Sequence, residues 1–194
     1  MTAQTCVDLL RHGQAEGGRR LRGSATADAL SARGWADMAR VIESVAGWEV
    51  LVSSPMRRCL DFARWASEQL DVGLRIEPRL AEYDFGAWSG RPLDALWREA
   101  GDDLASFLAD PGRVTPPGGE TADEFRARVR AAWAELLASE GGRHVLLVSH
   151  GGVLRQIVSD VLGSPFSIHA ALEWPHAGLT RVRAFDDSVG GRST

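Results

Sequence analysis

The sequence has 194 residues, a length that suits one well-buried domain and is short for two independent cores. Its composition, 44% hydrophobic and 25% charged, is that of a globular chain, and no apolar run approaches the ~20 residues needed to cross a bilayer. A membrane span is therefore excluded. Residues 1–5 show no basic segment followed by a hydrophobic stretch, so we expect a cytoplasmic location.

The charged residues exclude several classes of partner and cofactor. A formal net charge of -4 argues against general affinity for nucleic acid, which needs a basic surface. All 22 basic residues are arginine, which excludes a Walker-type phosphate loop and a Schiff-base mechanism because both need lysine. Arginine binds phosphate well through paired hydrogen bonds, so a local anion site stays compatible with this composition.

Short apolar runs with strand character recur along the chain. Six of them are residues 7–11, 49–53, 74–80, 144–149, 169–174 and 179–185. The run at 145–148 is unbroken and apolar, as expected of a strand that helices cover on both faces. We therefore place it at the centre of a sheet.

Helical periodicity lies between the strands, at residues 31–47, 54–70, 93–100, 104–109, 121–137 and 153–162. Three of these segments carry clear start signals. Ser31 is a predicted N-cap, Ser54 with Pro55 predicts the start of the second helix, and Thr121 with Glu124 forms a capping box. Helices that alternate with strands predict an α/β fold, a three-layer helix-sheet-helix sandwich with a mostly parallel central sheet.

We expect a single domain over residues 1–185 and a flexible tail at 186–194, which is polar and rich in glycine. Residues 87–119 lose the regular pattern and contain several prolines and paired glycines. Such a stretch is typical of a lid or insertion over a site.

Reactive residues gather at the ends of three predicted strands. The first strand ends in Arg11-His12-Gly13, the second runs through residues 53–58, and a later one ends in residues 149–152. Parallel strands end at one edge of a sheet, so two histidines and at least two arginines should meet there beside helix N-termini that favour an anion. A neutral imidazole can attack phosphorus while arginines stabilise the charge on its oxygens. The sequence therefore predicts a phosphate site with nucleophiles.

Glu82 is the candidate proton donor for such chemistry. It follows a predicted strand and lies near Tyr83, Phe85 and Trp88, and burial among aromatic side chains favours the protonated form of a carboxyl group. We take Trp88 as the tryptophan that shapes the site. Asp84 lies two residues on, so an ordinary ion pair stays open as the role of either carboxylate.

Five motifs follow one another along the chain: Leu10-Arg11-His12-Gly13, Ser53-Ser54-Pro55-Met56-Arg57-Arg58, Leu80-Ala81-Glu82-Tyr83-Asp84-Phe85-Gly86, Pro117-Gly118-Gly119-Glu120-Thr121 and Val148-Ser149-His150-Gly151-Gly152. In this order they resemble the histidine phosphatase superfamily, the phosphoglycerate-mutase-like group. The resemblance spans nearly the whole chain. It implies a phosphoglycerate-mutase-like fold and a phosphoric monoester hydrolase.

The same resemblance implies roles for individual residues. His12 is the implied phosphorylated nucleophile, Glu82 the proton donor, and Arg11, Arg58 and His150 the phosphate pocket. Further candidate contacts for the phosphate or the substrate are Gln14, Arg22, Gly151 and His176.

The sequence departs from the family pattern at three positions outside the catalytic set. Gln14 stands where many members have glutamate, Gly18 lies near the place of a usual asparagine, and Phe62 replaces a frequent threonine. Residues 22–24 and 30–35 are similar to small bacterial members that include α-ribazole phosphatases.

The spacing of cysteine, arginine and histidine residues excludes two other kinds of catalytic site. Cys6 and Arg11, like Cys59 and Arg64, are separated by four residues, one short of the phosphotyrosine-phosphatase loop. No H-E-x-x-H or similar cluster occurs, so we expect no metal and no cofactor. The two cysteines form no disulfide framework, and we expect both to be buried.

We therefore predict a metal-independent phosphomonoester phosphatase that acts through phosphohistidine on a small phosphorylated metabolite, with α-ribazole phosphate as one candidate. A phosphoglycerate mutase and a non-catalytic phospho-ligand binding protein on the same scaffold are the alternatives. No nucleic-acid or membrane partner is expected, and a homodimer is left open. Of the other polar residues, Arg57 should be solvated, and His144 and His169 should be ordinary strand residues.

Overall fold

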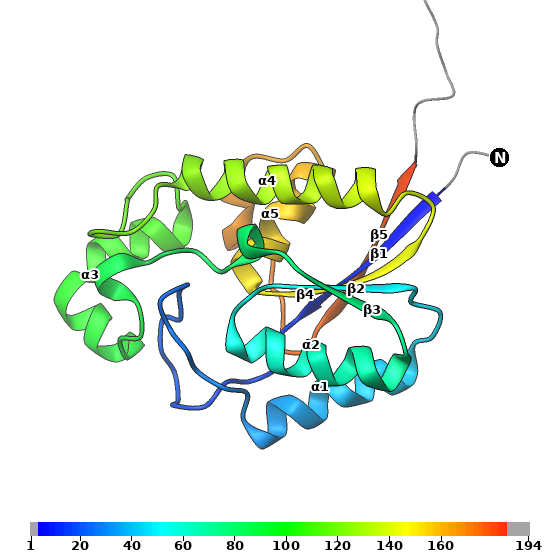
Figure 1. Cartoon of the computed structure of the whole chain (residues 1–194). Coiled ribbons are helices and arrows are strands. Elements are labelled where there is room, and N and C mark those ends of the chain that lie inside the picture. Colours follow the sequence, from blue (N-terminus) through cyan, green and yellow to red (C-terminus); the bar gives the residue numbers. More distant parts are fainter. Residues whose placement is uncertain (1–3, 186–194) are drawn as a thin grey trace, which may run out of the picture.

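The computed structural model describes residues 4–185, at whose centre lies a five-stranded sheet (Figure 1). In spatial order its strands are β3 (Gly73–Ile76), β2 (Val50–Ser53), β4 (His144–Ser149), β1 (Gln4–Arg11) and β5 (Leu179–Phe185). The first four run parallel to one another, and β5 is antiparallel to β1. The predicted mostly parallel sheet is thus confirmed, while the tail predicted at 186–194 lies outside the described residues.

Helices cover both faces of the sheet (Figure 1). They are α1 (Ala32–Ser44) and α2 (Arg57–Leu70) on one face, and α4 (Ala122–Ser139) and α5 (Gly151–Val161) on the other. Side chains of β4 alternate between two apolar cores: Leu146 and Val148 pack with α1 and α2, whereas Val145 and Leu147 pack with α4 and α5. The predicted three-layer sandwich is confirmed.

The four central residues of β4, from 145 to 148, are fully buried. Each such side chain stabilises the fold by about 1.5–3 kcal/mol relative to exposure, which explains the unbroken apolar run. The segment predicted to be the central strand therefore occupies that place.

α3 (Leu93–Ala109) extends beyond the sheet rather than covering a face (Figure 1). Ala100 inside it has non-helical angles of φ -140° and ψ 37°, so the two helical pieces predicted at 93–100 and 104–109 are halves of one kinked helix. No helix within residues 4–185 is long and apolar enough to cross a membrane.

Two of the three predicted helix starts are confirmed. The Ser31 hydroxyl accepts a hydrogen bond of 3.0 Å from the Gly34 amide. Thr121 and Glu124 form the reciprocal bonds of a capping box, which begins α4. The start predicted at Ser54 is wrong, because α2 begins at Arg57 with Met56 as its N-cap.

Two strand predictions need correction. Residues 169–174 form no strand: the short helix η3 (Phe166–Ala170) and a turn follow α5, and β5 alone pairs with the outer edge of β1. The strand predicted at 74–80 ends at Ile76, and Pro78, which has no amide hydrogen for a ladder, begins the 3₁₀ helix η1 (Pro78–Leu80) instead.

Thr121→Ala tests the start of α4. The hydroxyl accepts from the Glu124 amide at 3.2 Å, and the Glu124 carboxylate accepts from the Thr121 amide at 2.8 Å. Loss of this cap should lower the free energy of unfolding by about 1 kcal/mol, measured by urea titration. Thr115→Ala, at an exposed loop position, is the matched control and should change it by less than about 0.5 kcal/mol.

Candidate active site

Three parallel strands deliver their reactive residues to one edge of the sheet. In the register of the sheet Arg11 of β1 pairs with Ser149 of β4, and Ser53 of β2 pairs with Val148. The His12 amide donates to the Ser149 carbonyl at 2.9 Å, which continues the ladder one residue past β1. His12 therefore emerges beside the residue that follows Ser149 in the chain.

That following residue is His150, and the two imidazole rings lie together. Their centroids are 5.2 Å apart, and the exposed fractions are 5% for His12 and 0% for His150. His12 Nδ1 lies 2.7 Å from the Gly13 carbonyl, which can only accept, so Nδ1 carries the hydrogen and Nε2 keeps its lone pair. The Ser54 hydroxyl lies 2.7 Å from His150 Nε2.

Gly13 is required by the close approach of two chain segments. A Cβ at this position would lie 2.1 Å from the carbonyl oxygen of Gly34, and a Cβ on Gly34 would lie 2.2 Å from that of Gln14. The start of α1 is thus packed directly against the turn after β1. This backbone contact holds the segment that carries His12.

Arg58 of α2 is fully buried, and its charge acts on both histidines. Its guanidinium donates to the Thr26 hydroxyl at 3.2 Å and to the Gly23 carbonyl at 3.4 Å, while its Nε has no hydrogen-bond partner among the described residues. Burial lowers the pKa of Arg58 below its ordinary value. The site therefore contains a desolvated cation that an incoming anion can stabilise.

The same positive charge acts on the histidines. Burial, and then repulsion from Arg58, hold the pKa of both His12 and His150 well below the ordinary value. Both imidazoles are consequently neutral near pH 7, the state in which nitrogen can act as a nucleophile or a hydrogen-bond partner.

Arg11 lies at the other side of His12 and is fixed by the loop before β5. It donates to the Trp174 carbonyl, and its second terminal nitrogen lies 3.3 Å from His176 Nε2. The His176 ring lies 5.6 Å from that of His12, and burial and then Arg11 lower the pKa of His176 to about 4. His176 therefore belongs to the site as predicted from its position.

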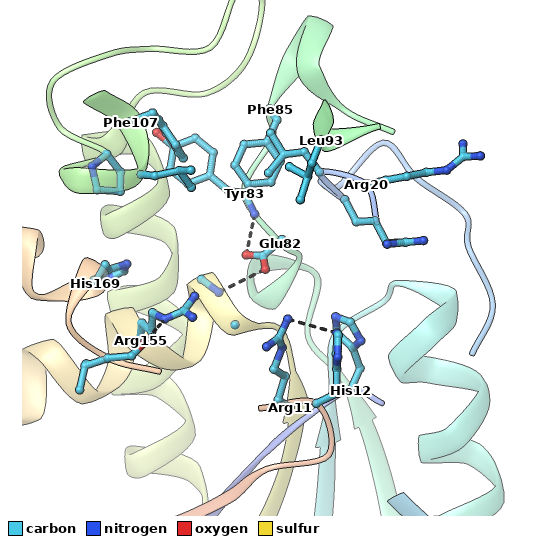
Figure 2. A pocket seen from close by; sticks show the side chains of 18 of the residues that line it. Arg11, His12, Arg20, Glu82, Tyr83, Phe85, Leu93, Phe107, Arg155 and His169 are labelled. Atoms are coloured by element: carbon cyan, nitrogen blue, oxygen red, sulfur yellow. Dashed lines mark hydrogen bonds between the residues drawn. The ribbon is translucent and has the colours of Figure 1, made fainter. Parts of the chain in front are cut away.

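Glu82 lies across the cavity from these cations with an exposed fraction of 9%. Its carboxylate accepts from the Tyr83 amide at 3.0 Å and from the Gly152 amide at 3.2 Å (Figure 2). Gly152 belongs to the first turn of α5, so the carboxylate is tied to the segment that carries His150. These two amides leave a second lone pair on each oxygen.

An arginine of α4 clamps the backbone on either side of Glu82. Arg128 donates to the carbonyls of Arg79 and Ala81 at 2.7 Å each and to the Glu82 carbonyl at 3.1 Å. It is held in turn by the Glu120 carboxylate at 2.6 Å. The predicted motif that contains Glu120 thus acts on Glu82 through Arg128.

A cavity of about 890 Å³ opens over these residues (Figure 2). Seven of the predicted site residues line it: Arg11, His12, Gln14, Arg22, Glu82, Gly151 and His176. Arg58 and His150 are fully buried and do not line the cavity, but the His150 ring contacts that of His12 and the charge of Arg58 acts on both rings. The structure therefore brings together every site residue predicted from the sequence.

Two predictions about neighbouring residues need correction, and a third is confirmed. His169 is no strand residue: it lies in η3 and lines the cavity. Trp88 does not line the cavity but packs its ring against Phe107, which does, at 5.9 Å between centroids. Arg57 is exposed as predicted and pairs with Asp61.

Sequence reasoning missed Arg155 and Ser54 as parts of the site. Arg155 of α5 lines the cavity, four residues and thus about one helical turn after Gly151, a spacing that could have identified it. Ser54 contacts His150 instead of capping α2.

A second buried polar cluster surrounds Asp8 of β1, away from the cavity. Arg181 donates to both carboxylate oxygens at 2.7 and 2.9 Å, and His144 and Trp48 add bonds of 2.9 and 2.8 Å. Burial raises the pKa of Asp8, but these hydrogen bonds outweigh it and the pKa lies below its ordinary value. Cys6 beside it is only partly buried, against the prediction, whereas Cys59 is buried. The cluster is explained as an ion pair that ties β5 to β1.

The model of the histidine phosphatase superfamily (branch 1) matches residues 7–190. The chain belongs to this superfamily. The chain is 31% identical over 186 residues to a probable phosphoglycerate mutase, GpmB, of Enterobacter sp. (strain 638), with 91% of this chain and 83% of that protein covered. It is also 30% identical over 185 residues to mycobacterial proteins, but covers only 50% of their length.

Solved structures agree with the fold. A mycobacterial glucosyl-3-phosphoglycerate phosphatase superposes on this chain with a TM-score of 0.83 at 29% identity, covering 93% of this chain and 90% of that one. The α-ribazole phosphatase from Shigella flexneri has a TM-score of 0.79 at 23% identity, covering 91% and 89%, and shows the fold alone. The predicted family and the phosphoglycerate-mutase-like fold are confirmed.

The low pKa of His12 and His150 predicts how stability depends on pH. In the unfolded chain both histidines titrate near pH 6.5, so below that pH the unfolded chain binds more protons than the native protein. The free energy of unfolding should therefore fall as the pH is lowered from about 7.5 to about 5.5. Urea titrations at a series of pH values measure this slope.

Imidazole ¹H–¹⁵N spectra give the site-specific check. The His12 and His150 signals should stay those of neutral rings through the range in which free histidine titrates. In Arg58→Gln their pKa values should rise, because a repelling charge is removed. A His12 ring that titrates near pH 6.5 in the native protein would contradict the electrostatics described above.

Proposed function

We propose that the protein hydrolyses phosphate monoesters in two steps through a phosphohistidine at His12. The observation that carries this proposal is the state of His12 Nε2. Its lone pair is free because Nδ1 donates to the Gly13 carbonyl, and burial and Arg58 keep the ring neutral. A buried, neutral and oriented imidazole between two guanidinium groups is suited to attack a bound phosphate.

In the first step His12 Nε2 attacks phosphorus and the bond from phosphorus to the leaving oxygen breaks. Glu82, protonated at that stage, gives its proton to the leaving oxygen, which departs as an alcohol. The positive charges of Arg11 and Arg58 stabilise the oxygens of the transferring group, and His150 adds a hydrogen-bond partner from behind His12. These groups are fixed before substrate binds, so they need little reorganisation.

In the second step water replaces the alcohol. Glu82, now a carboxylate, takes a proton from this water as its oxygen attacks phosphorus and the nitrogen–phosphorus bond breaks. The products are inorganic phosphate, neutral His12 and protonated Glu82, so the cycle closes without a metal or a second cofactor. The guanidinium groups supply the positive charge that a metal supplies in other phosphatases.

We further propose a small phosphorylated metabolite as the substrate and the cytoplasm as the location. α-Ribazole phosphate stays one candidate, and the ester named for the mycobacterial structure, glucosyl-3-phosphoglycerate, is another. Residues 87–119 are proposed as the lid, because Leu93, Phe107 and Leu108 of α3 and Pro111 line the cavity.

A likeness to a probable phosphoglycerate mutase favours one alternative, in which the phosphoryl group on His12 returns to the product. The two activities separate in one assay. Release of inorganic phosphate from 4-nitrophenyl phosphate without added bisphosphoglycerate supports the phosphatase, whereas interconversion of 2- and 3-phosphoglycerate with little phosphate release supports the mutase. Binding without either reaction identifies a phospho-ligand binding protein.

His12→Ala should lower kcat/KM by about 10³-fold or more, because it removes the nucleophile. The wild-type protein, mixed with a ³²P-labelled phosphate ester and quenched in alkaline detergent, should carry a label that survives base and is lost in acid. Peptide mapping should place it on His12. Full turnover by the alanine variant would rule out the mechanism.

Glu82→Gln should impair esters with poor leaving groups far more than those with good ones. A leaving group of low pKa needs no proton in the transition state, so the loss of Glu82 should cost about 10²–10⁴-fold with phenyl phosphate and much less with 2,4-dinitrophenyl phosphate. The measurement is the dependence of kcat/KM on leaving-group pKa. Equal losses across the series would show that Glu82 is not the acid.

Arg128→Met tests whether the clamp positions Glu82. The variant should show the same dependence on the leaving group as Glu82→Gln but to a smaller degree, because the carboxyl group is present and less well placed. Arg130→Met, two residues along α4 and paired with Asp160 at the surface, is the matched control and should leave the series unchanged. A uniform loss with all esters would indicate only a structural role for Arg128.

A further inference from the structure

The cavity is much larger than the phosphate site at its end. The Arg11 and His12 end accounts for a minor part of its lining, and the rest comes from α5, η3, α3 and the loop around residues 14–22. These walls face the leaving group of any ester whose phosphorus lies at His12. The charge and polarity of these walls therefore indicate which leaving groups the cavity can bind.

One wall of this outer part is apolar. Tyr83, Phe85 and Phe107 have exposed fractions of 3%, 8% and 5%, and Leu93 lies beside them on the same side of the cavity (Figure 2). Tyr83 and Phe85 stack at 5.3 Å with an interplanar angle of 17°. A leaving group that lies against these side chains meets apolar surface.

The opposite wall carries Arg155, which Figure 2 shows between Glu82 and His169. Its Nε donates to the Leu172 carbonyl at 2.7 Å, which fixes the plane of the guanidinium. A Cβ on Gly151 would lie 3.2 Å from Arg155 Nη1 and 3.4 Å from Arg11 Nε. The guanidinium groups of Arg155 and Arg11 thus flank the same glycine.

Arg155, like Arg11 and Arg58, lacks the carboxylate partner that two other fixed arginines of this region have. Arg22 is paired with Asp28 and Arg128 with Glu120, each within 3.1 Å. No carboxylate of the described residues forms an ion pair with Arg155. The positive charge is therefore held in place at the cavity wall, next to a second cation, and available to a ligand.

We propose that Arg155 binds a second anionic group on the substrate, a carboxylate or a second phosphate carried by the leaving group. The ester is then bound with its phosphorus at His12, its second anion at Arg155 and an apolar face against Phe107 and its neighbours. This inference rests on the proposed function and narrows its substrate class. Monoesters whose leaving group is neutral lack the second contact.

Two matched esters test the subsite: 3-carboxyphenyl phosphate and 3-carbamoylphenyl phosphate, which are similar in size and differ in charge. The wild-type protein should have a kcat/KM at least about tenfold higher for the carboxylate ester. This ratio should fall as salt is added, because salt screens the attraction to Arg155. Arg155→Met should bring the ratio close to one, and Arg57→Met, on the exposed face of α2, should leave it unchanged.

The outcomes separate the two proposals. Failure of the wild-type protein to hydrolyse either ester overturns the proposed function itself. Hydrolysis of both esters at equal kcat/KM, or an equal loss on both in Arg155→Met, overturns the subsite and leaves the phosphatase intact.

Arg155→Met removes the bond to the Leu172 carbonyl and so threatens folding, which a measurement on the wild-type protein avoids. The inhibition constants of 3-carboxybenzylphosphonate and 3-carbamoylbenzylphosphonate should differ in the same sense and with the same salt dependence. Equal constants overturn the subsite without any variant.

Discussion

The structure depends on a buried positive charge that no carboxylate of the described residues pairs with. Arg58 is fully buried and is held by the Thr26 hydroxyl and the Gly23 carbonyl, which are weaker partners for a guanidinium than a carboxylate. Removing such a group from water is unfavourable, and apolar side chains of similar size would stabilise the core better. The unfavourable free energy of burying this guanidinium arises at the proposed phosphate site, where a bound anion can offset it. Burial and the same charge keep His12 and His150 neutral, so the cation that an anion can stabilise also favours the protonation state that the proposed attack of His12 needs.

Backbone contacts rather than side chains bring these groups together. The parallel register of β1 with β4 places the two histidines one residue beyond paired strand ends, and the sheet allows no slip because each face of β4 is buried in its own core. Gly13 and Gly34 then let the first turn of α1 touch the segment after His12. On the other side Arg128 donates to the backbone carbonyls of Arg79, Ala81 and Glu82. His12 and Glu82, the proposed nucleophile and acid, are thus fixed by two independent sets of backbone contacts.

The sequence predicts the parts of this arrangement that rest on local patterns. The apolar run at 145–148, the capping box at Thr121 and the histidines that follow two strands are each encoded within a few residues. Residues 169–174 were predicted wrongly because their composition suits a strand, while the place beside β1 is already taken by β5. His169 was missed as a site residue for a related reason: which side chains of η3 face the cavity depends on how η3 packs, and the local sequence does not contain that information. Arg155 was missed although its spacing of one helical turn from Gly151 could have identified it.

The residues at the two ends of the cavity therefore differ in how well the sequence predicts them. At the His12 end the chemistry requires a few residue types at strand ends, and the family motifs identify them. At the outer end the walls come from segments that lie far apart in the chain, and their task is to fit one leaving group among many. The charge of the walls restricts the possible leaving groups more than the shape of the walls does. Apolar surface binds many groups with small differences in affinity, whereas a fixed guanidinium favours an anion over a neutral group of the same size. For this reason Arg155, rather than the larger aromatic wall, is the residue from which the substrate class can be inferred.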